Sequence, residues 1–155
     1  GQRQAEQVEL LRSLWGEESL DYTGEFHRVD KASINPRPSQ SIPIWFGGAA
    51  PALLRRCARL GDGWVPLMGA NSSAADAIRL LKKGRADAGK SWDDFQIQAQ
   101  AQYAGGTPER WQSHSDKWEA LGATKIAIAT HNAGETDVDG HLGRLEAYLS
   151  VVRKA

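Results

Sequence analysis

Strand-like segments alternate with helical patterns four times in this sequence, and this alternation limits the possible folds more than any other feature. The strands are predicted at residues 42–46, 63–66, 95–103 and 125–130, and each is followed by a segment with helical periodicity. Strands that are each followed by a helix form parallel sheets with right-handed crossovers. The expected fold class is therefore α/β, with four parallel strands and their helices.

Five helices are predicted, at residues 4–15, 50–60, from the residue after Ser72 or Ser73 to about 88, from Pro108 onward, and 138–152. Either Ser72 or Ser73 could cap the third helix, and Thr107 is the expected cap of the fourth. Apolar residues at helical spacing should form the buried stripes of the first and last helices, namely Val8, Leu11 and Trp15, and Leu142, Leu145, Leu149 and Val152.

The third predicted strand alternates small apolar residues with glutamines. Ile97, Ala99 and Ala101 occupy one face of the strand, and Gln98, Gln100 and Gln102 occupy the other. In a barrel, one of these faces points to the interior. The alternation alone leaves open which face does so.

An arm of residues 16–41 leads into the first strand, and the whole chain, residues 1–155, is expected to form a single domain. The aromatic and β-branched run around Gly24 fits either a short hairpin or an extended segment. Arg37 lies between two prolines that hold the chain extended. Its guanidinium could reach a phosphate or an acidic substrate, or could simply lie on the surface.

Composition excludes several partners. The chain has 19 Lys and Arg against 19 Asp and Glu, so no basic surplus points to nucleic acid, and no apolar run is long enough to span a membrane. Cys57 is the sole cysteine, which rules out an internal disulfide and agrees with a cytoplasmic setting. We therefore expect a cytoplasmic protein with no nucleic-acid or membrane partner.

The first predicted strand ends in Gly47 and Gly48, and a helix begins shortly afterwards. Glycines let the backbone turn sharply and approach a ligand closely. The free N–H groups and the positive dipole of the following helix would point back at this turn. The pattern fits a phosphate cradle, and it equally fits a plain strand-to-helix turn.

The histidines do not form a metal site, because none of the pairs among His27, His114, His131 and His141 has helical i, i+4 spacing and no carboxylate cluster accompanies them. His131 follows the last strand and is a candidate pocket residue, whereas His141 should begin the last helix. No nucleophile with a positioned base is visible, so the catalytic residues are unassigned.

Several ordered motifs resemble the luciferase-like monooxygenase family. They are Leu11–Trp15, Tyr22–Phe26, Asn35–Gln40, Pro43–Gly48, Gly61–Trp64, Trp118–Ala123 and His141–Leu142. The resemblance covers nearly the whole chain and is strongest to the branch that uses the deazaflavin coenzyme F420. Members of this family are eight-stranded barrels of roughly twice this length.

The resemblance matches the chain to the family from the fourth barrel helix to the end. It implies the C-terminal half of a (β/α)8 TIM barrel, without the N-terminal half that carries most of the substrate pocket. Pairing with a second copy would close an eight-stranded structure, so a homodimer is expected. A small open α/β sheet unrelated to the barrel is the other possible architecture.

The resemblance also implies a function, namely hydride transfer between a bound cofactor and a small organic substrate. Coenzyme F420 is the favoured cofactor and FMN the alternative. The family places the cofactor phosphate at the turn that corresponds here to Gly47, Gly48, Ala49 and Ala50. Trp64 would line the barrel mouth near the ring system, or else pack in the core. The alternative function is a non-catalytic half-barrel that self-associates.

Overall fold

Four parallel strands form the central sheet of the protein. The computed structural model describes residues 1–134 and 136–152. The strands lie in the order β3 (Trp45–Gly47), β4 (Gly63–Val65), β5 (Gln96–Gln102) and β6 (Lys125–Ala129). Every neighbouring pair is parallel. The parallel sheet predicted from the sequence is thus confirmed, and sequence order equals spatial order as in a barrel.

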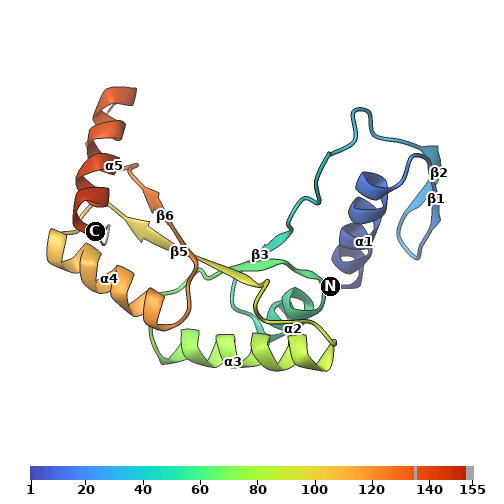
Figure 1. Ribbon diagram of the computed structural model, residues 1–155, viewed down its shortest axis with the longest axis horizontal. Helices are drawn as coiled ribbons and strands as arrows, with labels where there is room; N and C mark the ends of the chain where they lie inside the picture. The colour runs from blue at the N-terminus through green and yellow to red at the C-terminus, as the bar shows by residue number, and fades with distance from the viewer. Residues whose placement is uncertain (135, 153–155) are drawn as a thin grey trace.

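Helices cover one face of this sheet. The helices are α1 (Gln2–Gly16), α2 (Pro51–Leu60), α3 (Ser72–Asp87), α4 (Pro108–Ala120) and α5 (Val138–Val152). Figure 1 shows α2, α3 and α4 along one side of the sheet, with α1 and α5 rising at its two ends. The molecule is therefore a crescent whose concave side carries no helix across its middle. None of the helices in the described part of the chain has the length and apolar character needed to cross a membrane.

The core lies between the sheet and these helices. Phe46, Trp64 and Ile97 are paired in register across β3, β4 and β5, and all three are buried in one cluster with Leu81 and Trp118 of the helices. Side chains alternate along a strand, so the neighbours of these residues point to the concave side. One face of the sheet is thus packed against the helices, and the other face lines the concave side of the molecule.

The orientation of β5 settles the question that its alternating sequence left open. Ile97, Ala99 and Ala101 are buried against the helices, whereas Gln100 and Gln102 are exposed on the other face. The glutamine face is therefore the one that lines the concave side.

The arm between α1 and β3 contains a two-stranded hairpin of β1 (Leu20–Thr23) and β2 (Arg28–Ala32). The Glu6 carboxylate of α1 accepts hydrogen bonds from the N–H groups of Glu25, Phe26 and His27 at 2.8, 3.0 and 2.7 Å. Its Oε1 also lies 2.9 Å from His27 Nδ1. A Cβ on Gly24 would stand 2.4 Å from the same carboxyl group, so a side chain there would displace the carboxylate. One carboxylate therefore ties the hairpin turn to α1.

Acid should release the hairpin from α1. Burial of the Glu6 carboxyl raises its pKa, but the hydrogen bonds from His27 and the backbone outweigh this and leave the pKa below its ordinary value of 4.5. Because the pKa is lower in the folded state, the stabilisation is fully present above pH 4.5 and is lost as the pH falls through the folded-state value. We expect amide-exchange protection of residues 25–27 to decline over that range.

The Glu6→Gln variant should show lower protection of these amides that does not change with pH, because its carboxamide keeps one acceptor oxygen but loses the charge and the second acceptor. Glu9→Gln, on the exposed face of the same helix, is the matched control and should keep the wild-type profile. Equal profiles for all three proteins would contradict the assigned role of Glu6.

Two local predictions are wrong. The cap of α3 is Asn71, whose side chain accepts from the N–H of Ala74 at 3.1 Å, so Ser72 is the first helical residue rather than a cap. The first strand of the sheet begins at Trp45 rather than Ile42. Pro43 has no N–H to donate to a strand ladder, and pairing with β4 starts only at Trp45.

The apolar stripes of the terminal helices are less buried than predicted. Val8 is buried, but Leu11 is 40% exposed. Leu142 and Leu149 of α5 are 50% and 37% exposed, and Tyr148 is the buried residue of that helix. These faces lie at the two ends of the sheet, beyond β3 and β6, where no described residue covers them.

Candidate functional site

The turn between β3 and α2 lies at the carboxyl end of β3, the edge at which barrel enzymes carry their sites. Gly48 has a φ of +115°, a backbone conformation that favours glycine. Its N–H donates to the carbonyl of Val65 at 3.1 Å, which anchors the turn to the end of β4. The predicted glycine pair therefore makes a fixed turn.

Two backbone donors at this turn have no acceptor in the part of the chain that the structure describes. Among the described residues, none accepts a hydrogen bond from the N–H of Ala49 or Ala50. Pro51, the first residue of α2, has no N–H, and the carbonyl of Ala50 already begins the helix by accepting from Leu53 and Leu54. The free donors thus coincide with the positive end of the α2 dipole, which is an arrangement suited to an anion.

Trp64 supports this turn from below. Its side chain is fully buried in β4, and its indole Nε1 donates to the carbonyl of Gly48 at 2.6 Å. Of the two roles considered for Trp64, core packing is the observed one. Trp64 would therefore act on a ligand only through the position of Gly48.

Open space lies over Gly47. A Cβ built on this residue would meet no atom within 4 Å, whereas a Cβ on Gly48 would stand 3.3 Å from Leu53 Cδ1. Gly47 is also exposed. A ligand group could therefore lie against the Gly47 backbone while it accepts hydrogen bonds from Ala49 and Ala50.

The histidines are spread over the molecule. His131 is exposed in the loop after β6. His141 lies in the first turn of α5, as predicted, with Nδ1 2.9 Å from Thr130 Oγ1, and His114 Nε2 lies 3.0 Å from the carbonyl of Gln100. Within residues 1–134 and 136–152, no three His, Cys, Asp or Glu side chains are grouped as metal ligands would be.

Arg37 is not brought to the glycine turn. It lines a cavity of about 580 Å³ between the end of α1 and the arm, together with Arg12 and Trp15. Its Nη1 lies 3.4 Å from the carbonyl of Gly16, and the side chain is exposed. Because the cavity lies on the side from which β3 begins, Arg37 cannot reach the phosphate cradle from this position.

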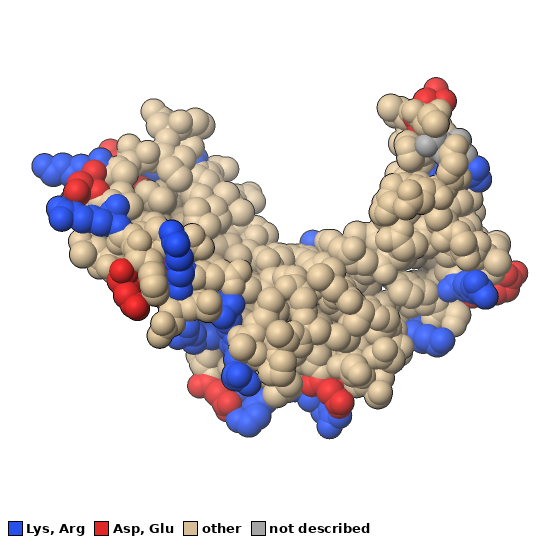
Figure 2. Space-filling view, turned by 180° about the vertical axis from the view of Figure 1, so that it is seen from behind, with Lys and Arg blue, Asp and Glu red and all other residues tan. Residues whose placement is uncertain are grey.

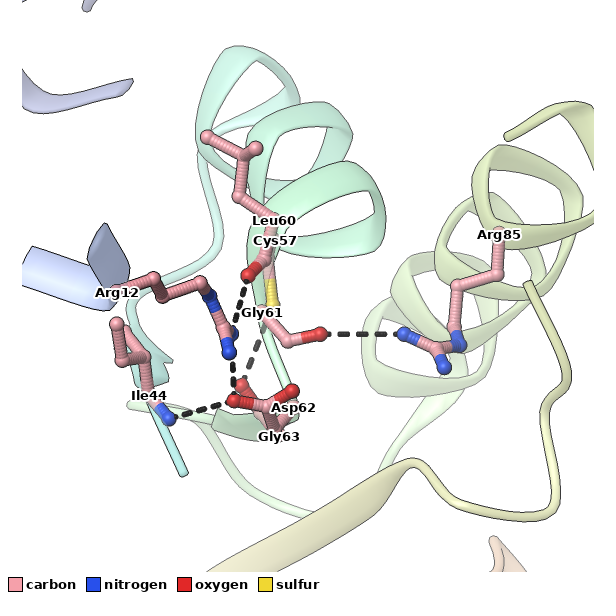
Figure 3. Close-up of polar contacts among 8 residues, drawn as sticks. All are labelled: Arg12, Ile44, Cys57, Leu60, Gly61, Asp62, Gly63 and Arg85. Carbon is pink, nitrogen blue, oxygen red and sulfur yellow. Dashed lines mark hydrogen bonds and ion pairs between the residues drawn. The ribbon is translucent and has the colours of Figure 1, made fainter. Parts of the chain in front are cut away.

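A polar clamp holds the opposite end of the strands, as Figure 3 shows. The Asp62 carboxylate accepts from the N–H of Ile44 and from Arg12 Nη2, both at 2.7 Å. Arg12 also donates to the carbonyl of Leu60 at 3.0 Å. Asp62 therefore links α1 to the residues that precede β3 and β4. It lies at the amino ends of these strands and has no part in a site at their carboxyl ends.

Two buried groups complete the clamp. Arg85, which is 6% exposed, donates from Nε to the carbonyl of Ser91 at 2.6 Å and from Nη1 to that of Gly61 at 3.1 Å. Burial raises the pKa of the Cys57 thiol to about 12, and its Sγ lies 3.3 Å from the carbonyl of Gly63. Cys57 is thus a protonated core residue rather than a nucleophile.

The order and direction of the four strands define part of a (β/α) barrel. The chain belongs to the luciferase-like monooxygenase family, whose model matches residues 1–152. An F420-dependent glucose-6-phosphate dehydrogenase of Nakamurella multipartita is 33% identical over 122 residues, which are 77% of this chain and 36% of that protein. The chain thus spans about a third of the length of this relative.

Solved structures show the same fold. An F420-dependent secondary alcohol dehydrogenase, in complex with an F420-acetone adduct, superposes with a TM-score of 0.78 over 97% of this chain and 61% of that one, at 14% identity. The F420-dependent tetrahydromethanopterin reductase of Methanopyrus kandleri superposes with a TM-score of 0.68 over 84% and 57%, at 13% identity. The predicted family and barrel-half fold are confirmed.

Proposed function

We propose that this chain is the cofactor-phosphate-binding half of an F420-dependent oxidoreductase. The supporting observation is the pair of free N–H groups at Ala49 and Ala50, set at the start of α2 beside the open backbone of Gly47. When bound, coenzyme F420 exchanges a hydride with an organic substrate, and the protein supplies binding and orientation. Trp64 would hold the cradle in shape through Gly48.

The cradle suits a phosphate group for two reasons. Its donors are backbone groups, which hold their direction without a loss of side-chain entropy. Its charge comes from the helix dipole, since the turn of residues 47–51 contains no Lys or Arg. The names of the related F420-dependent enzymes favour F420 as the cofactor, with FMN as the alternative.

The setting of the enzyme is proposed from the same relatives. A small organic substrate would bind next to the cofactor, at the carboxyl ends of the strands. A cytoplasmic location agrees with the buried, reduced Cys57. The expected homodimer remains a prediction.

Gly47→Val should weaken the binding of F420 by about a hundredfold, because the valine would occupy the space against the backbone where the phosphate is placed. The fold should be retained, since the added Cβ meets no protein atom. A fluorescence titration of the purified chain with F420, repeated with FMN, measures the affinity for each cofactor.

Gly16→Val is the matched control, because a Cβ on Gly16 also meets no atom and lies at the far end of α1. It should bind F420 as the wild type does. Wild-type protein that binds neither cofactor would refute the proposed function, and equal affinities for the two variants would refute the assignment of the turn.

A further inference from the structure

A cavity of about 290 Å³ lies at the carboxyl end of β5, beside the loop that leads to α4. The pairing of β4 with β5 ends at Trp64 and Ile97, whereas β5 continues to Gln102. Pro66 comes directly after β4 and has no N–H with which to extend the ladder. Gln100 and Gln102, from the stretch of β5 beyond this pairing, line the cavity.

Trp111 of α4 lines the same cavity and carries an unpaired hydrogen-bond donor. Its side chain is 8% exposed, and among the described residues none accepts a hydrogen bond from its Nε1. Tyr103 and Tyr148 hold the indole in place, with ring centroids 4.5 and 5.7 Å from that of Trp111. A buried N–H without an acceptor is unfavourable, so a ligand oxygen at this position would form a hydrogen bond that the described residues do not supply.

Two glycines form the part of the loop that lies over this indole. A Cβ on Gly106 would clash with Trp111 Nε1, so the absence of a side chain lets the loop approach the N–H group closely. The neighbouring Gly105 has a φ of +70°, a conformation that favours glycine. Both glycines line the cavity, and neither has a side chain that would block a ligand. A small shift of this loop would therefore admit an oxygen atom to Nε1.

Arg110 and His114 add two basic side chains to the cavity wall. Arg110 is exposed, and its Nη1 lies 3.4 Å from the carbonyl of Gly105. Among the described residues, no carboxylate forms an ion pair with this guanidinium. His114 Nε2 lies 3.0 Å from the carbonyl of Gln100, which fixes the imidazole against β5. The Arg110 guanidinium is thus available to a ligand.

The balance of charge around the cavity is positive. An adjoining cavity of about 410 Å³ shares Arg110 and His114 and adds Lys117 and Glu109. The Glu109 carboxylate already accepts a hydrogen bond from Thr107 Oγ1 at 2.8 Å. The hollow of the crescent, by contrast, carries few charged side chains, as Figure 2 shows. An anion would therefore find cations beside α4 and few on the concave face.

We infer that the cavity beside Trp111 binds the oxyanion group of a small ligand, a carboxylate or a phosphate. One oxygen of this group accepts a hydrogen bond from Trp111 Nε1, and another pairs with the Arg110 guanidinium, whose fork of donors matches both kinds of oxyanion. The cavity is on β5, two strands away from the Gly47 turn on β3. The inference therefore does not rest on the proposed cofactor site.

The indole N–H signal of Trp111 in proton–nitrogen correlation spectra reports on this binding, and it is the indole signal that Trp111→Phe removes. The protein is titrated with sodium phosphate and, separately, with sodium acetate, while sodium chloride keeps the ionic strength constant. We expect a saturable downfield shift of the Trp111 signal, with the other indole signals unchanged. The anion with the lower dissociation constant identifies the group that the cavity prefers.

Arg110→Gln should weaken the binding of the preferred anion by about tenfold. Arg3→Gln removes an exposed arginine of α1 and is the matched control, which should bind as the wild type does. The amides of Gly105 and Gly106 should shift with the same dissociation constant, and they give the measurement should Trp111→Phe not fold. The absence of a saturable shift with either anion would overturn the inference, and so would equal affinities of the two arginine variants.

Discussion

Replacing Arg85 with methionine should lower the free energy of unfolding by about 3 kcal/mol. The guanidinium donates to the carbonyls of Ser91 and Gly61, and the side chain is 6% exposed. Methionine keeps the apolar stem but leaves two inward carbonyls without these donors, and each unsatisfied group costs about 1–3 kcal/mol. Urea unfolding followed by tryptophan fluorescence measures the loss.

Arg79→Met is the control on the same helix. Arg79 is exposed and pairs at the surface with Asp76, so its replacement should change the free energy of unfolding by less than about 0.5 kcal/mol. Similar losses for the two variants would show that the carbonyls of Ser91 and Gly61 do not depend on Arg85.

Trp64→Phe should lower the free energy of unfolding by about 1–2 kcal/mol more than Trp118→Phe does. Both indoles are fully buried, but Nε1 of Trp64 donates to Gly48, whereas Nε1 of Trp118 has no partner among the described residues. The loss of packing is therefore similar in the two variants, and their difference reports the lost hydrogen bond of Trp64 together with the removal of the unpaired N–H of Trp118. Thermal or urea unfolding of both variants gives this difference.

The same pair of variants separates stability from binding. Trp64→Phe releases the carbonyl of Gly48 and should also weaken the binding of F420, because the cradle loses its support. Trp118→Phe should leave the affinity unchanged, since Trp118 lies on α4, away from the turn. Equal affinities would show that the turn keeps its shape without the indole.

The alternation of strands and helices was sufficient to predict the parallel sheet, because each apolar strand run is separated from the next by a helical repeat. Which face of β5 packs against the helices could not be predicted. Glutamines alternate regularly with small apolar residues along β5, and only the position of the helices decides which of the two sets is buried. The exposed stripe of α5 could not be predicted either, since periodicity indicates an apolar face but not whether anything covers it.

The glycine turn could be located from the sequence, because glycines between an apolar run and a helix have few other uses. Its assignment as the cofactor site remains a prediction. The roles of Glu6 and Arg85 could not be found in this way. Glu6 accepts from the backbone N–H of Glu25, 19 residues away, and Arg85 donates to the backbone carbonyl of Gly61, 24 residues away. No side-chain pattern in the sequence marks such backbone partners.

The two hydrophobic clusters are unequal in size, and this gives the molecule graded local stability. The larger one joins α2, α3 and β3 to β5, whereas the smaller one holds α5 through Tyr148 against Trp111 and Ala101. Segments with few buried contacts open without global unfolding. We therefore expect the last helix to open at a lower free energy than the sheet, and to do so while the β3–α2 turn stays folded.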